Sequence, residues 1–182
     1  MRHRHFTSFL VVSWFAFVAG VGAADGPATF KVSEFTFARP AGWEWVESAS
    51  PMRKAQLKVP DAGKAIGAEV VFFHFGAGQG GDSKANIDRW LGQFKEPRDQ
   101  IKPTIEDVKI GQRKVSYVRA EGTYLSGPPA GAKTPQPGSM LLGAIIESDE
   151  GNVFVKLTGP AALVKSSADD FKKMIAGALQ GK

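Results

Sequence analysis

The residues with the clearest chemical spacing lie in one glycine-rich segment, Phe75–Asp82. Gly76, Gly78 and Gly81 match the pattern G-x-G-x-x-G between a strand-like and a helix-like segment. In this pattern glycines let backbone amides approach a phosphate, and the N-terminus of the following helix stabilises its charge. The segment therefore suggests a first hypothesis, in which the Gly76–Asp82 loop binds an anion or a nucleotide, either as part of an enzyme or as a binding site.

The sequence after this loop argues against a dinucleotide-binding fold. Such a fold needs a second parallel apolar strand after the helix, ending in an acidic residue. Residues 96–103 read EPRDQIKP and cannot form that strand. The more ordinary interpretation is a flexible connection between a strand and a helix, although loops of this kind often contact ligands.

Other reactive side chains are scarce. The chain has no cysteine, and His74 is the only histidine after residue 24. Thiolate chemistry is therefore excluded, and a metal site built on sulfur or histidine is not expected. His74 is expected to be satisfied by a neighbouring carbonyl within a strand. The motifs HExxH, GxSxG and SxxK are absent, so no catalytic residue, metal site or cofactor is predicted.

Three larger side chains are candidate ligand contacts. Trp43 ends the turn Pro-Ala-Gly-Trp, Arg53 precedes a strand-like segment, and Arg89 stands directly before Trp90 on a helix-like segment. Core packing is the alternative for the tryptophan, and an ion pair within the fold is the alternative for either arginine. The candidate ligand-binding residues are Trp43, Arg53, Gly76, Gly78, Gly81 and Arg89.

The first 24 residues have the pattern of a secretory signal peptide. Arg2 and Arg4 precede an apolar stretch, Phe6–Val21, and small residues follow it up to Ala24. An apolar run of about 17 residues is at the lower limit for a transmembrane helix, which is the alternative. We therefore expect cleavage, a secreted or periplasmic location and no stable membrane span afterwards.

Composition and charge are those of an ordinary globular protein. Of 182 residues, 43% are hydrophobic and 23% charged, so residues 25–182 are predicted to form a single domain. The formal net charge of +5 is spread along the chain rather than clustered. A nucleic-acid partner is not predicted, because binding nucleic acid requires a concentrated basic face.

Strand-like segments dominate the chain after residue 25. Glycine-containing turns separate Ile105–Ile110 from Lys114–Tyr124, and Ser139–Ser148 from Asn152–Thr158. Each pair is predicted to form a β-hairpin. Ala68–Phe75 is apolar almost throughout, which is typical of a central strand covered on both faces.

Two amphipathic helices are predicted, at Ser83–Lys95 and Ser167–Leu179, from apolar residues at helical spacing. The proline- and glycine-rich residues 126–138 are predicted to be an exposed loop. Consecutive hairpins with two helices imply an α+β fold, a mostly antiparallel sheet with helices packed against it.

The order of these features resembles the PsbP-like (Mog-type) superfamily. The resemblance rests on Pro40-Ala-Gly-Trp43, a helix with Arg89-Trp90, the hairpins, and Asn152–Pro160 before a C-terminal helix, and it covers most of Phe30–Leu179. It implies an α/β/α sandwich without shared catalytic residues. Members are largely accessory or binding proteins: photosystem subunits, a Ran-GTPase partner and exported bacterial proteins. Many exported members carry a lipidated cysteine, which this chain lacks.

The function expected from these observations is an exported, non-enzymatic accessory or binding domain of the cell envelope. Its partner would be an envelope protein or a small ligand.

Overall fold

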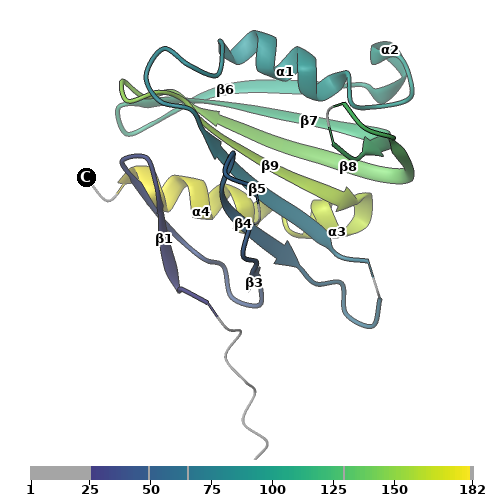
Figure 1. The fold of residues 1–182 in the computed structure, drawn as a ribbon, viewed down its shortest axis with the longest axis horizontal. Helices are drawn as coiled ribbons and strands as arrows, with labels where there is room; N and C mark the ends of the chain where they lie inside the picture. The colour runs from purple at the N-terminus through teal and green to yellow at the C-terminus, as the bar shows by residue number, and fades with distance from the viewer. Residues whose placement is uncertain (1–25, 49, 65, 129, 181–182) are drawn as a thin grey trace, which may run out of the picture.

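Seven strands form one antiparallel sheet at the centre of the protein (Figure 1). The computed structural model describes residues 26–180 apart from 49, 65 and 129, so the predicted signal peptide lies outside the described residues. The strands, in the order in which they lie across the sheet, are β3 (Glu44–Trp45), β4 (Arg53–Val59), β5 (Ala68–His74), β9 (Val153–Pro160), β8 (Thr134–Ile146), β7 (Arg113–Ser126) and β6 (Thr104–Ile110).

Every strand pair in the described residues is antiparallel. The predicted hairpins correspond to β6–β7 and β8–β9. The predicted α+β class, a mostly antiparallel sheet with helices packed on it, is therefore confirmed. None of the described helices has the length and apolar character that crossing a membrane requires.

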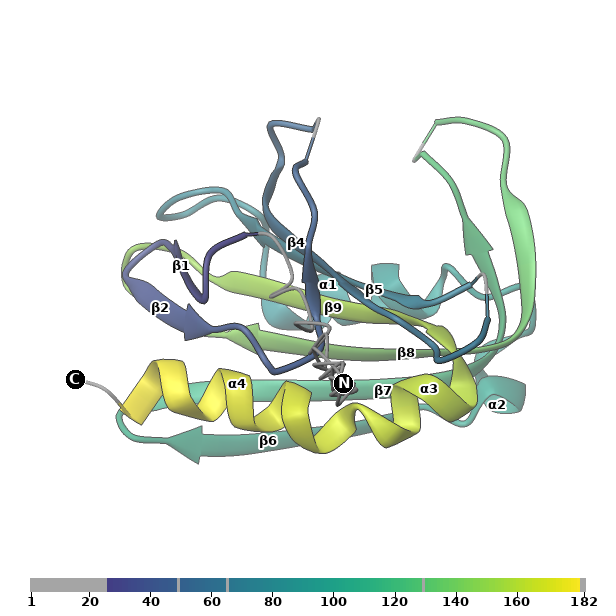
Figure 2. The same ribbon diagram turned by 90° about the horizontal axis from the view of Figure 1, so that it is seen from below.

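One face of the sheet is covered by the hairpin of β1 (Thr29–Val32) and β2 (Phe35–Ala38) together with α3 (Ala161–Ser166) and α4 (Ala168–Gln180) (Figure 2). Alternate residues of each strand point to this face, because side chains in a strand alternate with a period of two. Their apolar side chains form the larger core with hairpin and helix residues such as Phe37, Phe171 and Ile175, none of which is exposed.

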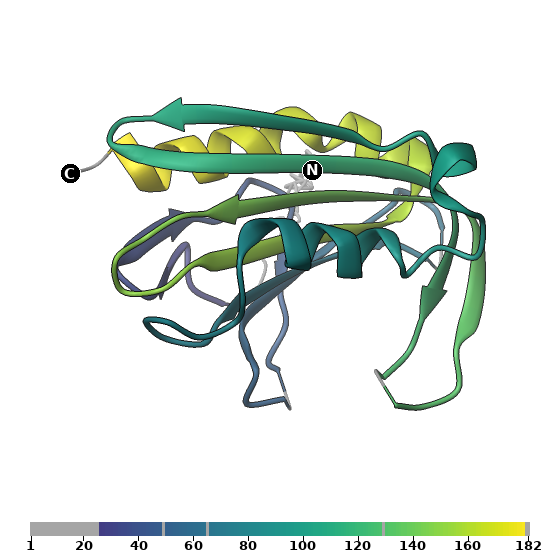
Figure 3. The ribbon, with the colours of Figure 1, turned by 90° about the horizontal axis from the view of Figure 1, so that it is seen from above.

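The opposite face carries α1 (Ser83–Leu91) and the short α2 (Arg98–Ile101) (Figure 3). Trp90 of α1 is 5% exposed and packs edge-on against Phe154 of β9, with ring centroids 6.5 Å apart. The Trp90 ring also lies directly over Gly143 of β8, which has no side chain to obstruct it. Because α1 is only nine residues long, it covers part of this face and leaves the rest open.

Helix α1 ends earlier than the sequence predicts. The prediction extended it to Lys95, but it ends at Leu91 and Gly92 caps it. The next residues run beside β7, where the Leu125 amide donates to the Gln93 carbonyl at 2.8 Å. The apolar spacing suggested a longer helix because Phe94, now in extended chain, still packs into the core beside α1.

The predicted loop at residues 126–138 is also shorter than expected. Strand β7 continues to Ser126 and β8 begins at Thr134, so two prolines of this segment lie inside a strand. A bulge between Gly122 and Tyr124 shifts the register where these strands extend, and prolines are tolerated in strands at such irregular or edge positions. The β7–β8 hairpin therefore projects beyond the rest of the sheet as an arm (Figure 2).

The contact between Trp90 and Gly143 allows the packing of α1 on the sheet to be tested. A Cβ at position 143 would overlap the Trp90 ring, so Gly143→Ala is expected to lower the free energy of unfolding by about 2 kcal/mol. Chemical denaturation measures the change.

Gly177→Ala is the matched control, because Gly177 lies on the exposed side of α4 and a Cβ there meets no atom within 4 Å. That change should stabilise the protein by up to about 1 kcal/mol through helix propensity. Equal effects of the two substitutions would contradict the described packing of α1.

Candidate functional site

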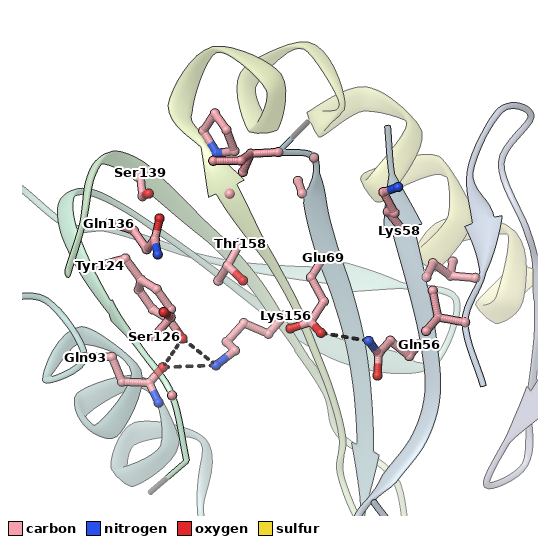
Figure 4. A pocket seen from close by; sticks show the side chains of 18 of the residues that line it. Gln56, Lys58, Glu69, Gln93, Tyr124, Ser126, Gln136, Ser139, Lys156 and Thr158 are labelled. Atoms are coloured by element: carbon pink, nitrogen blue, oxygen red, sulfur yellow. Dashed lines mark hydrogen bonds between the residues drawn. The ribbon is translucent and has the colours of Figure 1, made fainter. Parts of the chain in front are cut away.

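The part of the sheet face that α1 leaves uncovered is a large cleft of about 1440 Å³. Its floor is formed by side chains of β4, β5 and β9, including Gln56, Glu69, Lys156 and Thr158 (Figure 4). Two connections, which we call the first arm (between β3 and β4) and the second arm (between β7 and β8), project on the same side of the sheet (Figure 2). Residues of both arms line the cleft, so its width is set by the two arms.

The floor is polar because of the strand alternation that builds the core. Glu69 stands between two buried apolar neighbours on β5, and Lys156 does so on β9. The neighbours point to the larger core, so Glu69 and Lys156 point to the opposite face. No helix of the described residues covers this part of the sheet, so the floor stays accessible to a ligand.

Lys156 is the central side chain of the cleft. Its ammonium donates to the Tyr124 hydroxyl oxygen at 2.9 Å and to the Gln93 side-chain oxygen at 3.0 Å (Figure 4). The Tyr124 hydroxyl in turn donates to the same Gln93 oxygen at 2.8 Å. The ammonium also lies 5.5 Å from the centre of the Tyr124 ring. Lys156 has no ion pair among the residues that the structure describes, so neutral oxygens and a ring hold its charge.

These surroundings change how Lys156 and Tyr124 titrate. Burial lowers the pKa of Lys156 from 10.5 to about 8. Glu69 partly opposes this shift, while the charges of the nearby Arg53, Arg89 and Lys133 add to it. Burial raises the pKa of Tyr124 to about 12. At neutral pH the lysine is therefore charged and the phenol is protonated.

The acidic residue on the floor, Glu69, is already paired. Its carboxylate accepts from the Arg53 guanidinium at 2.7 Å and from the Gln56 amide at 2.8 Å. Arg53 also donates to the Gln56 side-chain oxygen at 2.9 Å. Arg53 thus makes the ion pair that was one of its two interpretations, and it also lines the cleft.

A second cavity of about 910 Å³, which we call the aromatic pocket, adjoins the cleft under α1. Met52, Phe73, Gln93, Gly127 and Lys156 line both cavities, so the two meet at Lys156. The aromatic side chains that line the pocket are Phe73, Phe75, Trp90 and Phe154. None of the described lining residues is acidic, and the cations are Arg89, Lys133 and Lys156.

The residues singled out in the sequence are divided by the fold. Arg53 lines the cleft, and Gly81 and Arg89 line the aromatic pocket. Trp43 is 4% exposed and lies in the larger core on the other side of the sheet, as its packing alternative expected. Gly76 and Gly78 are not among the described residues that line either cavity.

The glycine-rich loop is organised by its own side chains. The Asp82 carboxylate accepts from the Ala85 amide at 2.7 Å and so caps α1. The Asn86 amide group donates to the carbonyls of Gly80 and Asp82, and the Asn86 oxygen accepts from Arg89. A carboxylate of the protein thus occupies the first turn of the helix, where a bound phosphate would otherwise gain most from the helix dipole.

His74 lies at the end of β5, away from this network. Its Nε2 is 3.0 Å from the Glu150 carbonyl oxygen, which is the kind of partner expected from the sequence. Its ring thus joins the β5 end to the β8–β9 turn.

The residues that sequence reasoning missed are Lys156, Gln93 and Tyr124. A single lysine within the apolar strand VFVKL was a signal for Lys156, because charged residues are rarely placed among buried strand residues. Gln93 had no such signal, because it was predicted to lie on a helix. Tyr124 was not among the candidate residues; its ring packs in the core under α1, and its hydroxyl joins the network.

Comparisons with known proteins give a limited result. No family model matches the chain, and no curated protein matches it. Among solved structures, PA94 from Pseudomonas aeruginosa, a protein of unknown function, has 17% identity and a TM-score of 0.44, covering 81% of this chain and 92% of its own. Cyanobacterial PsbP (CyanoP) from Synechocystis sp. PCC 6803 has 12% identity and a TM-score of 0.46, covering 86% and 93%.

The partly desolvated charge of Lys156 predicts a stability effect. Lys156→Met removes that charge and leaves the hydrogen bond between Tyr124 and Gln93 in place. It is expected to raise the free energy of unfolding at pH 7 by about 1 kcal/mol. Urea denaturation measures the difference between the two proteins.

The pH dependence of this difference follows from the lowered pKa. Below pH 8 the lysine is charged in both states, and the cost of burying it is fully present. Between pH 8 and 10.5 the unfolded chain binds more protons, so the wild type gains stability and the difference shrinks. Lys58→Met, at a lysine paired with Glu44 on the same floor, is the control and should change stability by less than about 0.5 kcal/mol. A loss of stability in Lys156→Met at pH 7 would contradict this account.

Proposed function

We propose that the chain is an exported, PsbP-like accessory or binding domain of the cell envelope, without enzymatic activity, and that the cleft holds a small ligand. The observation that carries the proposal is the uncovered half of the sheet face. A face of this size is ordinarily covered by a helix, yet here two arms keep about 1440 Å³ open above a polar floor. Large clefts with a few placed polar groups are the usual sites for small ligands.

The PsbP-like assignment is supported by the placement of the residues that suggested it. The Pro40–Trp43 turn leads into the edge strand β3, and Trp90 seats α1 on the sheet. Val153–Pro160 form β9 and lead directly into α3 and α4. The helices and the hairpin lie on both faces of an antiparallel sheet (Figures 1 and 3), as the resemblance implies for a sandwich.

The alternative, an enzyme or nucleotide-binding protein that uses the Gly76–Asp82 loop, has less support. Asp82 already caps α1, and a bound phosphate would meet its carboxylate. Gly81 borders the aromatic pocket, but the other two motif glycines do not line it. Gln79 of the loop also lines this pocket, but the cations Arg89, Lys133 and Lys156 come from α1, the second arm and β9.

The test is mass spectrometry of the full chain after expression in a bacterial host and recovery from its periplasm. The intact mass is expected to correspond to a chain that begins at Ala24 or Asp25. Native mass spectrometry is expected to show a small-molecule adduct that denaturation releases.

Two tryptophan substitutions locate the adduct. Thr158→Trp fills the cleft floor and should abolish it, whereas Lys109→Trp, at an exposed position of the edge strand β6, should leave it unchanged. An unprocessed chain confined to the cytoplasm would contradict export. A protein without an adduct, or one whose adduct survives Thr158→Trp, would contradict ligand binding in the cleft.

A further inference from the structure

The aromatic pocket has an excess of positive charge. Arg89 donates to the Asn86 side chain, and Lys133 donates to the carbonyls of Gly127 and Pro128. With Lys156, these are three cations whose described partners are all neutral. Elsewhere along the cleft the lysines are paired, as Lys64 is with Asp61. The pocket is therefore complementary to a negative charge.

The same pocket presents apolar surface that the fold does not bury. Phe75 is 41% exposed and Met52 is 53% exposed. The Phe75 ring stacks on Phe73 with centroids 6.4 Å apart and lies 6.0 Å from Phe154. These rings form an accessible aromatic wall next to the cations, and exposed apolar surface beside a cavity is typical of a binding site.

We propose that the aromatic pocket binds a small amphipathic anion, with a carboxylate or phosphate head against Lys156 and Arg89 and an apolar body against Phe73 and Phe75. Because the aromatic pocket opens into the cleft at Lys156, this inference rests on the proposed function and names the class of its ligand, whose body lies in the pocket and reaches the cleft there. An ammonium group has three N–H donors. Lys156 gives one to Tyr124 and one to Gln93, so one is left for the head group.

The hydrogen bonds around Lys156 make the site ready for an anion. Gln93 and Tyr124 fix the ammonium, so little side-chain entropy is lost when a ligand binds. Because the charge has no carboxylate partner in the described residues, a ligand anion need not displace an existing ion pair. The partly buried ammonium has lost hydrogen bonds to water, and an anion would supply one in their place. A hydrogen bond between two charged groups is stronger than one between neutral groups.

The affinity should depend on the protonation of Lys156. An anion binds the charged lysine, whose pKa is about 8 in the free protein. The affinity is therefore expected to be constant below that pH and to fall as the pH rises from 8 to about 9.5. The charged and titratable groups that face Lys156 from the neighbouring elements are Arg53 on β4, Glu69 on β5, Arg89 on α1, Tyr124 on β7 and Lys133 on the second arm.

The experiment compares 1-naphthaleneacetate with 1-naphthaleneacetamide by isothermal titration calorimetry on the ligand-stripped chain at pH 7. The two probes share one apolar body and differ in charge. The acid is expected to bind at least about ten-fold more tightly, because a charge-assisted hydrogen bond replaces a neutral one. Acetate, which has no apolar body, should bind at least about ten-fold more weakly than the naphthyl acid. Comparing the affinity of 1-naphthyl phosphate with that of 1-naphthaleneacetate shows whether the site prefers a phosphate or a carboxylate head.

Variants identify the side chain that binds the charged head group. Lys156→Met should weaken binding of the acid about ten-fold or more and leave the amide within about two-fold. Lys58→Met, which lines the cleft but not the aromatic pocket, should leave both probes unchanged. Arg89→Gln is a second variant and should weaken the acid selectively.

Equal affinity for acid and amide would overturn the inference, as would an acid affinity that survives Lys156→Met or the absence of binding by every probe. None of these results decides the proposed function, which depends on the native adduct and its loss in Thr158→Trp. Conversely, if the native adduct proves to be uncharged, the cleft remains the ligand site and only the inference that the ligand is an anion is contradicted.

Discussion

A charged lysine on the floor of an open cleft, held by a phenol and an amide rather than by a carboxylate, is the interaction on which the site depends. Strand alternation places Lys156 on the face opposite the larger core. Its neighbours on β9 are buried in the larger core, which leaves the side chain only the cleft face of the sheet. The fold must therefore accommodate the charge where it lies, and it does so with two hydrogen bonds at about 3 Å. A buried charge without a partner of opposite sign lowers stability. Residues that cost stability and persist in a fold are commonly those that serve binding.

The position of Gln93 follows from a competition between helix and strand. The sequence predicts a helix through Lys95, but the helix ends at Leu91, two residues before Gln93. Residues 93–95 instead form a turn and an isolated bridge to Tyr124, held beside β7 by backbone hydrogen bonds. The bulge between Gly122 and Tyr124 shifts the register of β7 at the same place. The Lys156 network thus joins the segment after α1, β7 and β9, and a change in any of them would move one of its three members.

The sequence predicts the framework better than the site. The strands, both hairpins, the C-terminal helix and the α+β class follow from alternation and helical spacing, which are local properties. The end of α1 and the length of β8 depend on tertiary pairing, so neither could be read from Phe94 or from the prolines. Arg53, Gly81 and Arg89 were singled out individually, and the fold places all three along the two cavities that meet at Lys156. Trp43, chosen on residue type alone, is part of the core. The network of Lys156, Gln93 and Tyr124 joins residues 31 to 63 positions apart in the chain, so no local sequence pattern predicts it.

The central claim is that Lys156 is charged at neutral pH but partly removed from water. An NMR titration that follows the side-chain carbon next to the Lys156 amine measures this most directly, with the Lys156→Met variant assigning the signal. The account predicts a midpoint near 8 in the free protein. A midpoint near 10.5, the ordinary value for lysine, would show a fully hydrated ammonium and would contradict the account.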